Sequence, residues 1–199
     1  MSFDKIEIER WLETEQSVFR ILVSMLFDTE KVICYRAAEI LGKAAAREAR
    51  RKPESVKELL RRLLWTMNDE SGNICWYAPE AIGEILYNVP ELCGEFCPLL
   101  MPYLNEEPFE RGTRLAIARI AGIKRGIFPE IVEKLKQSLA NTEPEIKGAS
   151  LLALASVEPG AAAEMVSAFE NDDDIFEIYE NETGNLVKIK ISELARKIT

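Results

Sequence analysis

The feature of this sequence that most restricts its possible folds is an apolar segment that recurs at intervals of about forty residues. Residues 32–42 reappear in outline as residues 73–83, and a third copy occupies residues 114–122. These copies end in glycine at positions 42, 83 and 122, so they are 41 and 39 residues apart, and a weaker fourth copy occupies residues 147–156. Periods of 20 to 50 residues are typical of stacked structural units, none of which can bury its apolar face alone.

Each copy has the 3.6-residue apolar period of an amphipathic helix and follows a second helical stretch. The pattern therefore predicts four to five helical hairpins within residues 1–170. Gly42, Gly83 and Gly122 lie beside the apolar stripes of their copies. Because a glycine inside a helix costs about 1 kcal/mol relative to alanine, glycines at equivalent positions predict that neighbouring helices approach closely there.

The pattern changes after residue 170. Residues 175–180 and 186–191 are rich in β-branched and aromatic side chains, and turn-forming residues separate them, which predicts a β-hairpin. Ser192 can begin a short last helix. An isolated hairpin is marginally stable in water, so we expect residues 171–199 to pack on the last repeat as a closing element.

The first copy contains Arg36-Ala37-Ala38-Glu39-Ile40-Leu41-Gly42, which resembles the repeat unit of HEAT-like proteins. The resemblance is to the short type found in phycobilisome lyase subunits and many bacterial HEAT-repeat proteins, and it covers roughly residues 16 to 170. The second copy departs from it, with Tyr77 in place of the arginine and Pro79 in place of the second alanine. The resemblance implies an all-α fold, a HEAT-like α-solenoid closed by the β-hairpin and short helix. It implies little about function, because such repeats serve many partners.

Composition excludes some classes of function. The chain carries 34 acidic and 25 basic residues, a formal net charge of −9. Tight nucleic-acid binding needs several Lys or Arg contacts to phosphates, so this charge argues against a nucleic-acid partner. The one dense basic run, from Arg47 to Arg62, is interpreted as a solvated helix end and loop, with a nucleic-acid or anionic-lipid patch as the alternative. No apolar run approaches the roughly 18 residues that span a bilayer, and the first residues lack signal-peptide features, so we expect a cytoplasmic protein without membrane attachment.

The sequence offers no recognisable catalytic set. It contains no histidine, which removes the usual general base and excludes Ser-His-Asp and Cys-His arrangements. Glycine-rich phosphate-binding motifs are also absent. Cys34, Cys75, Cys93 and Cys97 form no Cys-x-x-Cys pair and are interpreted as reduced, buried residues. We therefore predict a non-enzymatic protein without a cofactor or a metal site.

The second copy differs from the others in its aromatic residues. It gathers Trp65, Trp76 and Tyr77 around Pro79. Proline inside a helix costs about 3 kcal/mol, so the helix either begins just before Pro79 or is kinked there. Both alternatives place Trp76 and Tyr77 in irregular backbone, where binding residues often lie. The structural alternative is that these aromatic side chains only fill the gap that the proline creates.

Aligning the copies by their glycines brings charged and aromatic residues into one row along the second helices. The predicted partner-binding residues are Arg36, Glu39, Trp76, Tyr77, Glu80, Glu84 and Arg119. Mixed charges around aromatic residues suit a polypeptide better than a polyanion. An internal salt-bridge ladder from Arg36 through Glu80 to Arg119 is the structural alternative.

The leading functional hypothesis is a protein-interaction module, an adaptor or assembly factor that binds a partner polypeptide on the concave face of the stack. A second hypothesis follows from the lyase resemblance, a maturation factor or enzyme subunit that acts on a protein-bound cofactor. It requires a reactive group, for which Cys75 beside Trp76 is the candidate. A third hypothesis is nucleic-acid binding through the Arg47–Arg62 region.

Overall fold

The structure, a computed structural model, describes residues 5–15, 17–68, 72, 74–123, 126–128, 130–140 and 143–198. This part of the chain contains eleven α-helices, three short 3-10 helices and one two-stranded antiparallel sheet. The predicted helical character of the repeat region and the predicted C-terminal hairpin and helix are therefore confirmed. Residues 1–4 and Thr199, which belong to the two predicted units 1–170 and 171–199, lie outside the described residues.

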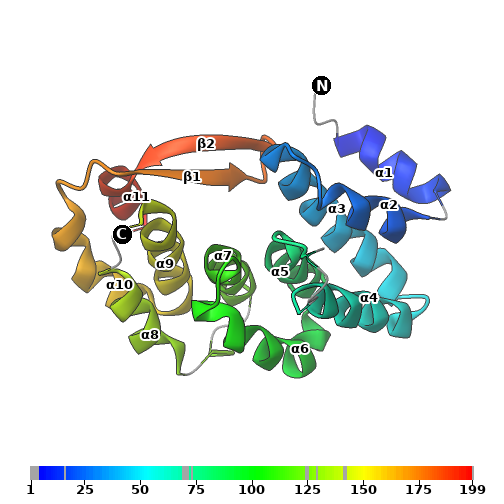
Figure 1. Cartoon of the computed structure of the whole chain (residues 1–199), viewed down its shortest axis with the longest axis horizontal. Coiled ribbons are helices and arrows are strands. Elements are labelled where there is room, and N and C mark those ends of the chain that lie inside the picture. Colours follow the sequence, from blue (N-terminus) through cyan, green and yellow to red (C-terminus); the bar gives the residue numbers. More distant parts are fainter. Residues whose placement is uncertain are drawn as a thin grey trace.

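Four helices that carry the repeat copies form an inner row (Figure 1). They are α3 (Lys31–Ala49), α5 (Ala78–Asn88), α7 (Glu110–Ala121) and α9 (Pro144–Val157), and each packs against the next in that order. The apolar stripes predicted from the sequence face the core. Leu41 of α3 and Ile82 of α5, for example, are completely buried.

The remaining helices of the repeat region pack on the outside of this row or connect its members (Figure 1). They are α1 (Lys5–Thr14), α2 (Val18–Met25), α4 (Pro53–Thr66), η1 (Pro90–Leu92), α6 (Cys93–Leu100), η2 (Met101–Asn105), α8 (Ile131–Ser138), α10 (Pro159–Met165) and η3 (Val166–Phe169). Helix α2 packs on α3, α4 packs on both α3 and α5, and α8 and α10 pack on α9. Their buried faces complete one continuous apolar core.

Close approach within the inner row occurs at two of the three predicted glycines. A Cβ atom at Gly42 would lie 2.6 Å from the carbonyl oxygen of Glu84, and one at Gly83 would lie 2.7 Å from the Cα of Ala116. The prediction for Gly122 is wrong. Gly122 is the residue after α7, and a Cβ there would meet only carbonyl oxygens of its own helix.

The C-terminal hairpin lies across the inner row (Figure 1). It consists of β1 (Ile175–Glu180) and β2 (Asn185–Lys190), paired from Ile175 with Lys190 to Glu180 with Asn185, and α11 (Ile191–Lys197) follows it. At one end, the buried ring of Phe176 fills the space above Gly148 of α9, where a Cβ would lie 2.3 Å from the ring. At the other end, Arg36 of α3 donates a hydrogen bond to the carbonyl oxygen of Gly184 (2.7 Å).

The hairpin and α11 contact α9, but this is only part of what the hairpin covers. A six-residue strand is about 20 Å long, and packed helices lie about 8–10 Å apart. The hairpin and its turn are long enough to pass over α7 and α5 and to reach α3. The closing element thus joins the last repeat to the first.

Candidate functional site beneath the C-terminal hairpin

The hairpin covers the side of the inner row that carries most of the predicted partner-binding residues. Glu39, Glu80 and Glu84 are all buried. Glu39 accepts a hydrogen bond from the hydroxyl of Tyr179 (2.7 Å), and Glu84 accepts one from the side-chain amide of Asn181 (3.2 Å). The predicted row therefore binds an extended segment of the chain itself.

The predicted ladder from Arg36 through Glu80 to Arg119 does not form with those pairings. Arg119 pairs with Glu84 (2.9 Å) and lies 3.6 Å above the centre of the Tyr87 ring. Arg36 contacts the turn of the hairpin, and Glu80 pairs with Arg111 instead. The sequence alignment identified the residues that face this side, but not their partners.

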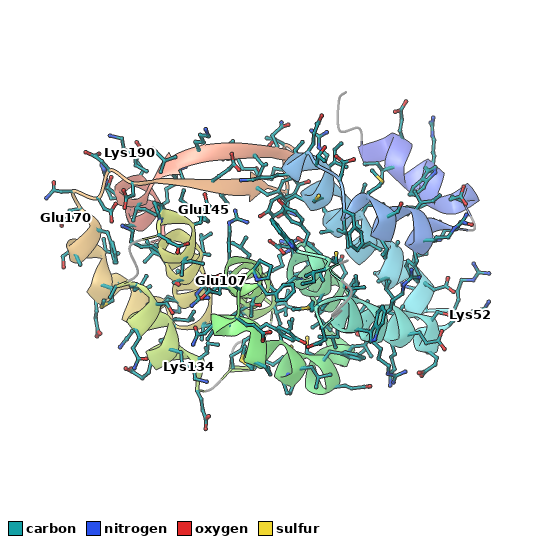
Figure 2. All side chains as sticks on the ribbon, in the orientation of Figure 1. Lys52, Glu107, Lys134, Glu145, Glu170 and Lys190 are labelled. Carbon is teal, nitrogen blue, oxygen red and sulfur yellow. The ribbon has the colours of Figure 1, made fainter. Side chains whose placement is uncertain are left out.

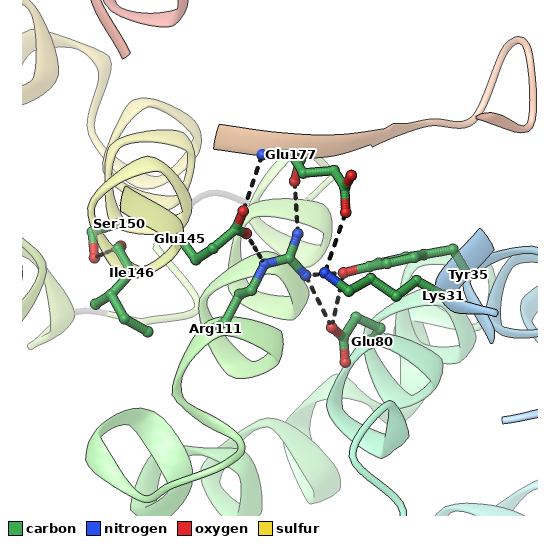
Figure 3. Close-up of polar contacts among 8 residues, drawn as sticks. All are labelled: Lys31, Tyr35, Glu80, Arg111, Glu145, Ile146, Ser150 and Glu177. Carbon is green, nitrogen blue, oxygen red and sulfur yellow. Dashed lines mark hydrogen bonds and ion pairs between the residues drawn. The ribbon is translucent and has the colours of Figure 1, made fainter. Parts of the chain in front are cut away.

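Arg111 is the centre of the polar network under the hairpin (Figure 3). Its guanidinium pairs with Glu145 of α9 (2.5 Å), donates to the carbonyl oxygen of Glu177 in β1 (2.7 Å) and donates to the hydroxyl of Tyr35 in α3. Glu80 of α5 lies 3.7 Å from the same guanidinium. One side chain of α7 thus connects all four inner helices with the hairpin.

Sequence reasoning missed Arg111, because it precedes the third copy and has no counterpart in the alignment by glycines. The neighbouring Gly112 was the one feature of the sequence that could have indicated a contact at this position. A Cβ at Gly112 would lie 2.4 Å from the Oε2 atom of Glu80, so this glycine makes room for the buried carboxyl group.

Glu80 is the least satisfied carboxyl group of this network. It is 8% exposed, and its Oε1 atom accepts a long hydrogen bond from Tyr35 (3.4 Å). Its Oε2 atom is buried without a hydrogen-bond partner among the described residues. Burial raises the pKa of the Glu80 carboxyl to about 8, and a backbone hydrogen bond offsets only a small part of this rise. Glu80 therefore holds its proton in a large fraction of molecules at neutral pH.

A cavity of about 240 Å³ lies between the hairpin and the inner row. Its lining is mostly apolar and also includes charged groups; the lining residues are Tyr35, Ala38, Glu80, Glu84, Leu115, Ala116, Ala118, Arg119, Leu152, Ile178, Tyr179 and Asn181. The rings of Tyr35 and Tyr179 stack, with centroids 5.3 Å apart. Burial, and then the hydrogen bond to Glu39, raises the pKa of Tyr179, so its hydroxyl acts as a donor. The cavity suits a small apolar group beside a protonated carboxyl group.

Trp76 and Tyr77 lie in the turn before α5, because that helix begins at Ala78 and carries Pro79 in its first turn. The sequence left two alternatives for this helix. The one in which it begins just before Pro79 is therefore correct, and the one in which it is kinked at Pro79 is wrong. The Tyr77 ring is half-buried and meets the Tyr35 ring edge-on, with centroids 5.4 Å apart. Trp76, in contrast, is 64% exposed, so it does not fill a gap beside the proline.

A second exposed tryptophan lies in α4, whose last turn contacts the segment that precedes Trp76. The backbone amide of Cys75 donates to the carbonyl oxygen of Thr66 (3.4 Å), which holds the segment before α5 against the last turn of α4. That turn carries Trp65, which is 63% exposed. We refer to Trp65 and Trp76 together as the tryptophan corner.

The four cysteines are buried and free, as the sequence indicated. Burial raises the pKa of the Cys75 thiol to about 12 and that of the Cys34 thiol to about 11. Both thiols therefore stay protonated, which is unfavourable for a nucleophile. Within the described ranges, no group of three or more Cys, Asp or Glu residues could hold a metal ion. The described part of the chain also contains no helix that is long and apolar enough to cross a membrane.

The Glu80→Gln substitution tests the environment of the buried carboxyl group. The pKa of Glu80 is about 8 in the folded chain and has its ordinary value of 4.5 when unfolded, so between these values only the folded state holds the proton. Ionisation of Glu80 therefore lowers stability as the pH rises from about 4.5 to about 8. Glutamine cannot ionise, so the stability of the variant relative to the wild type should rise by about 1.4 kcal/mol for each pH unit across this window. Urea denaturation at several pH values measures this difference in stability. A difference that does not change with pH contradicts the raised pKa of Glu80.

Comparison with known proteins identifies a relative of this chain but no function. No protein-family model matches it, so the resemblance to HEAT repeats stays a prediction, and no solved structure matches it either. A protein of Archaeoglobus fulgidus described as "Uncharacterized protein" is 31% identical over 178 residues, which cover 87% of this chain and 91% of the relative. The chain belongs to the same family as this Archaeoglobus fulgidus protein.

Proposed function

We propose that this protein is a non-enzymatic protein-interaction module, an adaptor or assembly factor, that binds a partner polypeptide at the tryptophan corner. The observation that carries the proposal is the exposure of two tryptophans on adjacent segments, 63% for Trp65 and 64% for Trp76. Tryptophan is enriched among the residues that contribute most to protein–protein binding. Because the hairpin covers the inner row, the partner contacts this corner rather than the buried carboxylates beneath the hairpin.

The proposal includes the architecture that the sequence resemblance implies, a HEAT-like α-solenoid. The successive contacts of α3, α5, α7 and α9, with α2, α4, α6 and α8 outside them, support this assignment. The cytoplasm, expected from the sequence, is the compartment in which we propose that the protein acts. The lyase-like alternative loses support because its candidate reactive group, Cys75, is buried with a raised pKa.

The test replaces both tryptophans with alanine and compares affinity purifications from the organism that produces the protein. We expect the partner to co-purify with the wild type and to be lost from the Trp65→Ala/Trp76→Ala variant. The melting temperature should change little, because both side chains are exposed. Leu99→Ala is the matched control, because Leu99 is an apolar residue of α6 that is 47% exposed. If the double variant keeps the partner, the tryptophan corner is not the binding surface.

The Tyr77→Ala/Arg119→Ala variant separates the corner from the inner row. Tyr77 packs on Tyr35, and Arg119 pairs with Glu84, so we expect this variant to lose stability. If it also keeps the partner, the inner row is structural and binding resides at the corner. Loss of the partner without any loss of stability would instead identify the inner row as the binding surface.

A further inference from the structure

The basic run that the sequence placed between Arg47 and Arg62 is divided by the fold into two sets. Lys57 and Arg61 face α6 and pair with Glu95 (2.9 and 3.2 Å). The second set points to another side of the molecule, where it lines a groove of about 830 Å³ between α1 and α2 and the ends of α3 and α4. Its members are Arg47, Arg51, Lys52 and Arg62. Packing therefore pairs two cations of the run with an acidic residue and gathers four others at one groove.

A fifth cation joins this set from a different helix. Arg20 of α2 also lines the groove, and two carboxylates, Glu15 and Glu48, are the acidic groups there. The formal charge of the lining is therefore +3, whereas the whole chain carries −9. In the described part of the chain, none of the five cations forms an ion pair, and Arg47 donates a hydrogen bond to the carbonyl oxygen of Leu12.

The groove also has an apolar wall. Leu12, Val18, Phe19 and Ala44 line it beside the cations, and Ser17 and Ser55 add two hydroxyl groups. Like charges held close together repel one another, and an anion bound among them removes this repulsion. Guanidinium groups bind phosphate through two parallel hydrogen bonds, and a phosphate monoester carries about −1.5 to −2 charges at neutral pH. A terminal phosphate of this charge, together with one or two inner phosphates that carry about one negative charge each, therefore matches a charge of +3.

We propose that this groove binds a small molecule that carries two or three adjacent phosphate groups, such as a nucleoside diphosphate or triphosphate. The phosphates contact Arg20, Arg51 and Arg62, and the apolar wall holds the uncharged part of the ligand. The volume lies within the range of about 300–1,000 Å³ found for small-molecule sites. This site is independent of the proposed tryptophan corner.

A small ligand fits the charge distribution better than a nucleic acid does. Electrostatic attraction and repulsion at protein surfaces extend over about 10 Å at moderate ionic strength. A small ligand stays within the basic groove, whereas a nucleic-acid strand continues onto the surface of a chain whose net charge is −9 and is repelled there. The same argument separates this site from a membrane surface covered with anionic lipid.

The experiment is a calorimetric titration of the full-length protein with inorganic tripolyphosphate, ATP, AMP and a single-stranded RNA. We expect saturable binding of tripolyphosphate and ATP with one ligand per chain, weaker binding of AMP, and an affinity that falls as salt is added. The Arg51→Gln/Arg62→Gln variant should bind ATP at least about tenfold more weakly. Both side chains are exposed, so the variant should fold, and circular dichroism checks this. Arg20→Gln, on a different helix, should weaken binding in the same direction.

The control is Lys134→Gln/Lys197→Gln, which removes the same amount of charge from α8 and α11. Figure 2 shows Lys134 at the lower left of the molecule, far from Lys52 at its right. The control should bind ATP as the wild type does. The proposal is overturned if the wild type binds neither tripolyphosphate nor ATP, or if the groove and control variants lose equal affinity. It is also overturned if RNA binds more tightly than ATP, because the site would then serve nucleic acid.

Discussion

Replacing Arg114 with methionine is expected to lower the free energy of unfolding by about 3–5 kcal/mol. The side chain is 2% exposed and is the largest fully buried one in the described chain. Its guanidinium donates to two backbone carbonyl oxygens and three side-chain oxygens, those of Leu104, Glu110, Asn105, Ser138 and Ser150. These bonds tie α7 to η2, α8 and α9. Methionine has a similar length but leaves the buried acceptors, the carbonyl oxygen of Leu104 and the hydroxyl of Ser150, without this donor, and each such loss costs about 1–3 kcal/mol.

Urea denaturation at neutral pH measures this effect, with Arg62→Met as the control. Arg62 is an exposed arginine of α4 without an ion pair among the described residues, so its replacement should change stability by less than about 0.5 kcal/mol. Arg114→Lys should be nearly as damaging as Arg114→Met, because an ammonium group cannot reach acceptors arranged around a planar guanidinium. A loss below about 1 kcal/mol for Arg114→Met would contradict the network.

The Gly83→Val substitution is expected to destabilise the fold by about 3 kcal/mol. A Cβ at position 83 would lie 2.7 Å from the Cα and 2.8 Å from the Cβ of Ala116. Both atoms belong to a buried part of α7, so no flexible side chain can move aside, and α5 and α7 must separate. The higher helix propensity of the new residue, a few tenths of a kcal/mol, offsets little of this cost.

Gly94→Ala is the matched control for this prediction. Gly94 also lies in a helix, α6, but a Cβ there would meet no atom within 4 Å. Alanine should therefore leave the stability unchanged or raise it by up to about 1 kcal/mol. Thermal denaturation followed by circular dichroism compares the two variants. If Gly83→Val melts within a degree or two of the wild type, α5 and α7 are not in the contact described.

The individual helices and strands could be predicted from the sequence, because local patterns determine them. The recurring apolar copies placed α3, α5, α7 and α9, and the alternation after residue 170 placed both strands to within one residue. The beginning of α5 remained open between two alternatives. The structure selects the one in which Pro79 lies in the first turn, where it has no helical hydrogen bond to break.

The candidate site was predicted only in part. The alignment by glycines identified the side of the inner row on which Glu39, Glu80 and Glu84 lie. Residues on one side of a helix recur every three or four positions, so the sequence around each residue is enough to show which side it faces. It could not show that the hairpin covers them. Tyr179 and Glu39 are 140 residues apart in the chain, and nothing in either neighbourhood specifies their contact.

The sequence by itself therefore determined which segments are helical, which faces of them are apolar, and where Gly42 and Gly83 allow neighbouring helices to meet. Only the tertiary structure decided which charged groups find partners. It buried Glu80 beside Arg111, paired Lys57 and Arg61 with Glu95, and left Arg51 and Arg62 facing a groove with Arg20. The physical reason is that helix formation and amphipathic burial depend on neighbours three or four residues away, whereas the partner of a charge depends on how distant helices and strands are placed by the core.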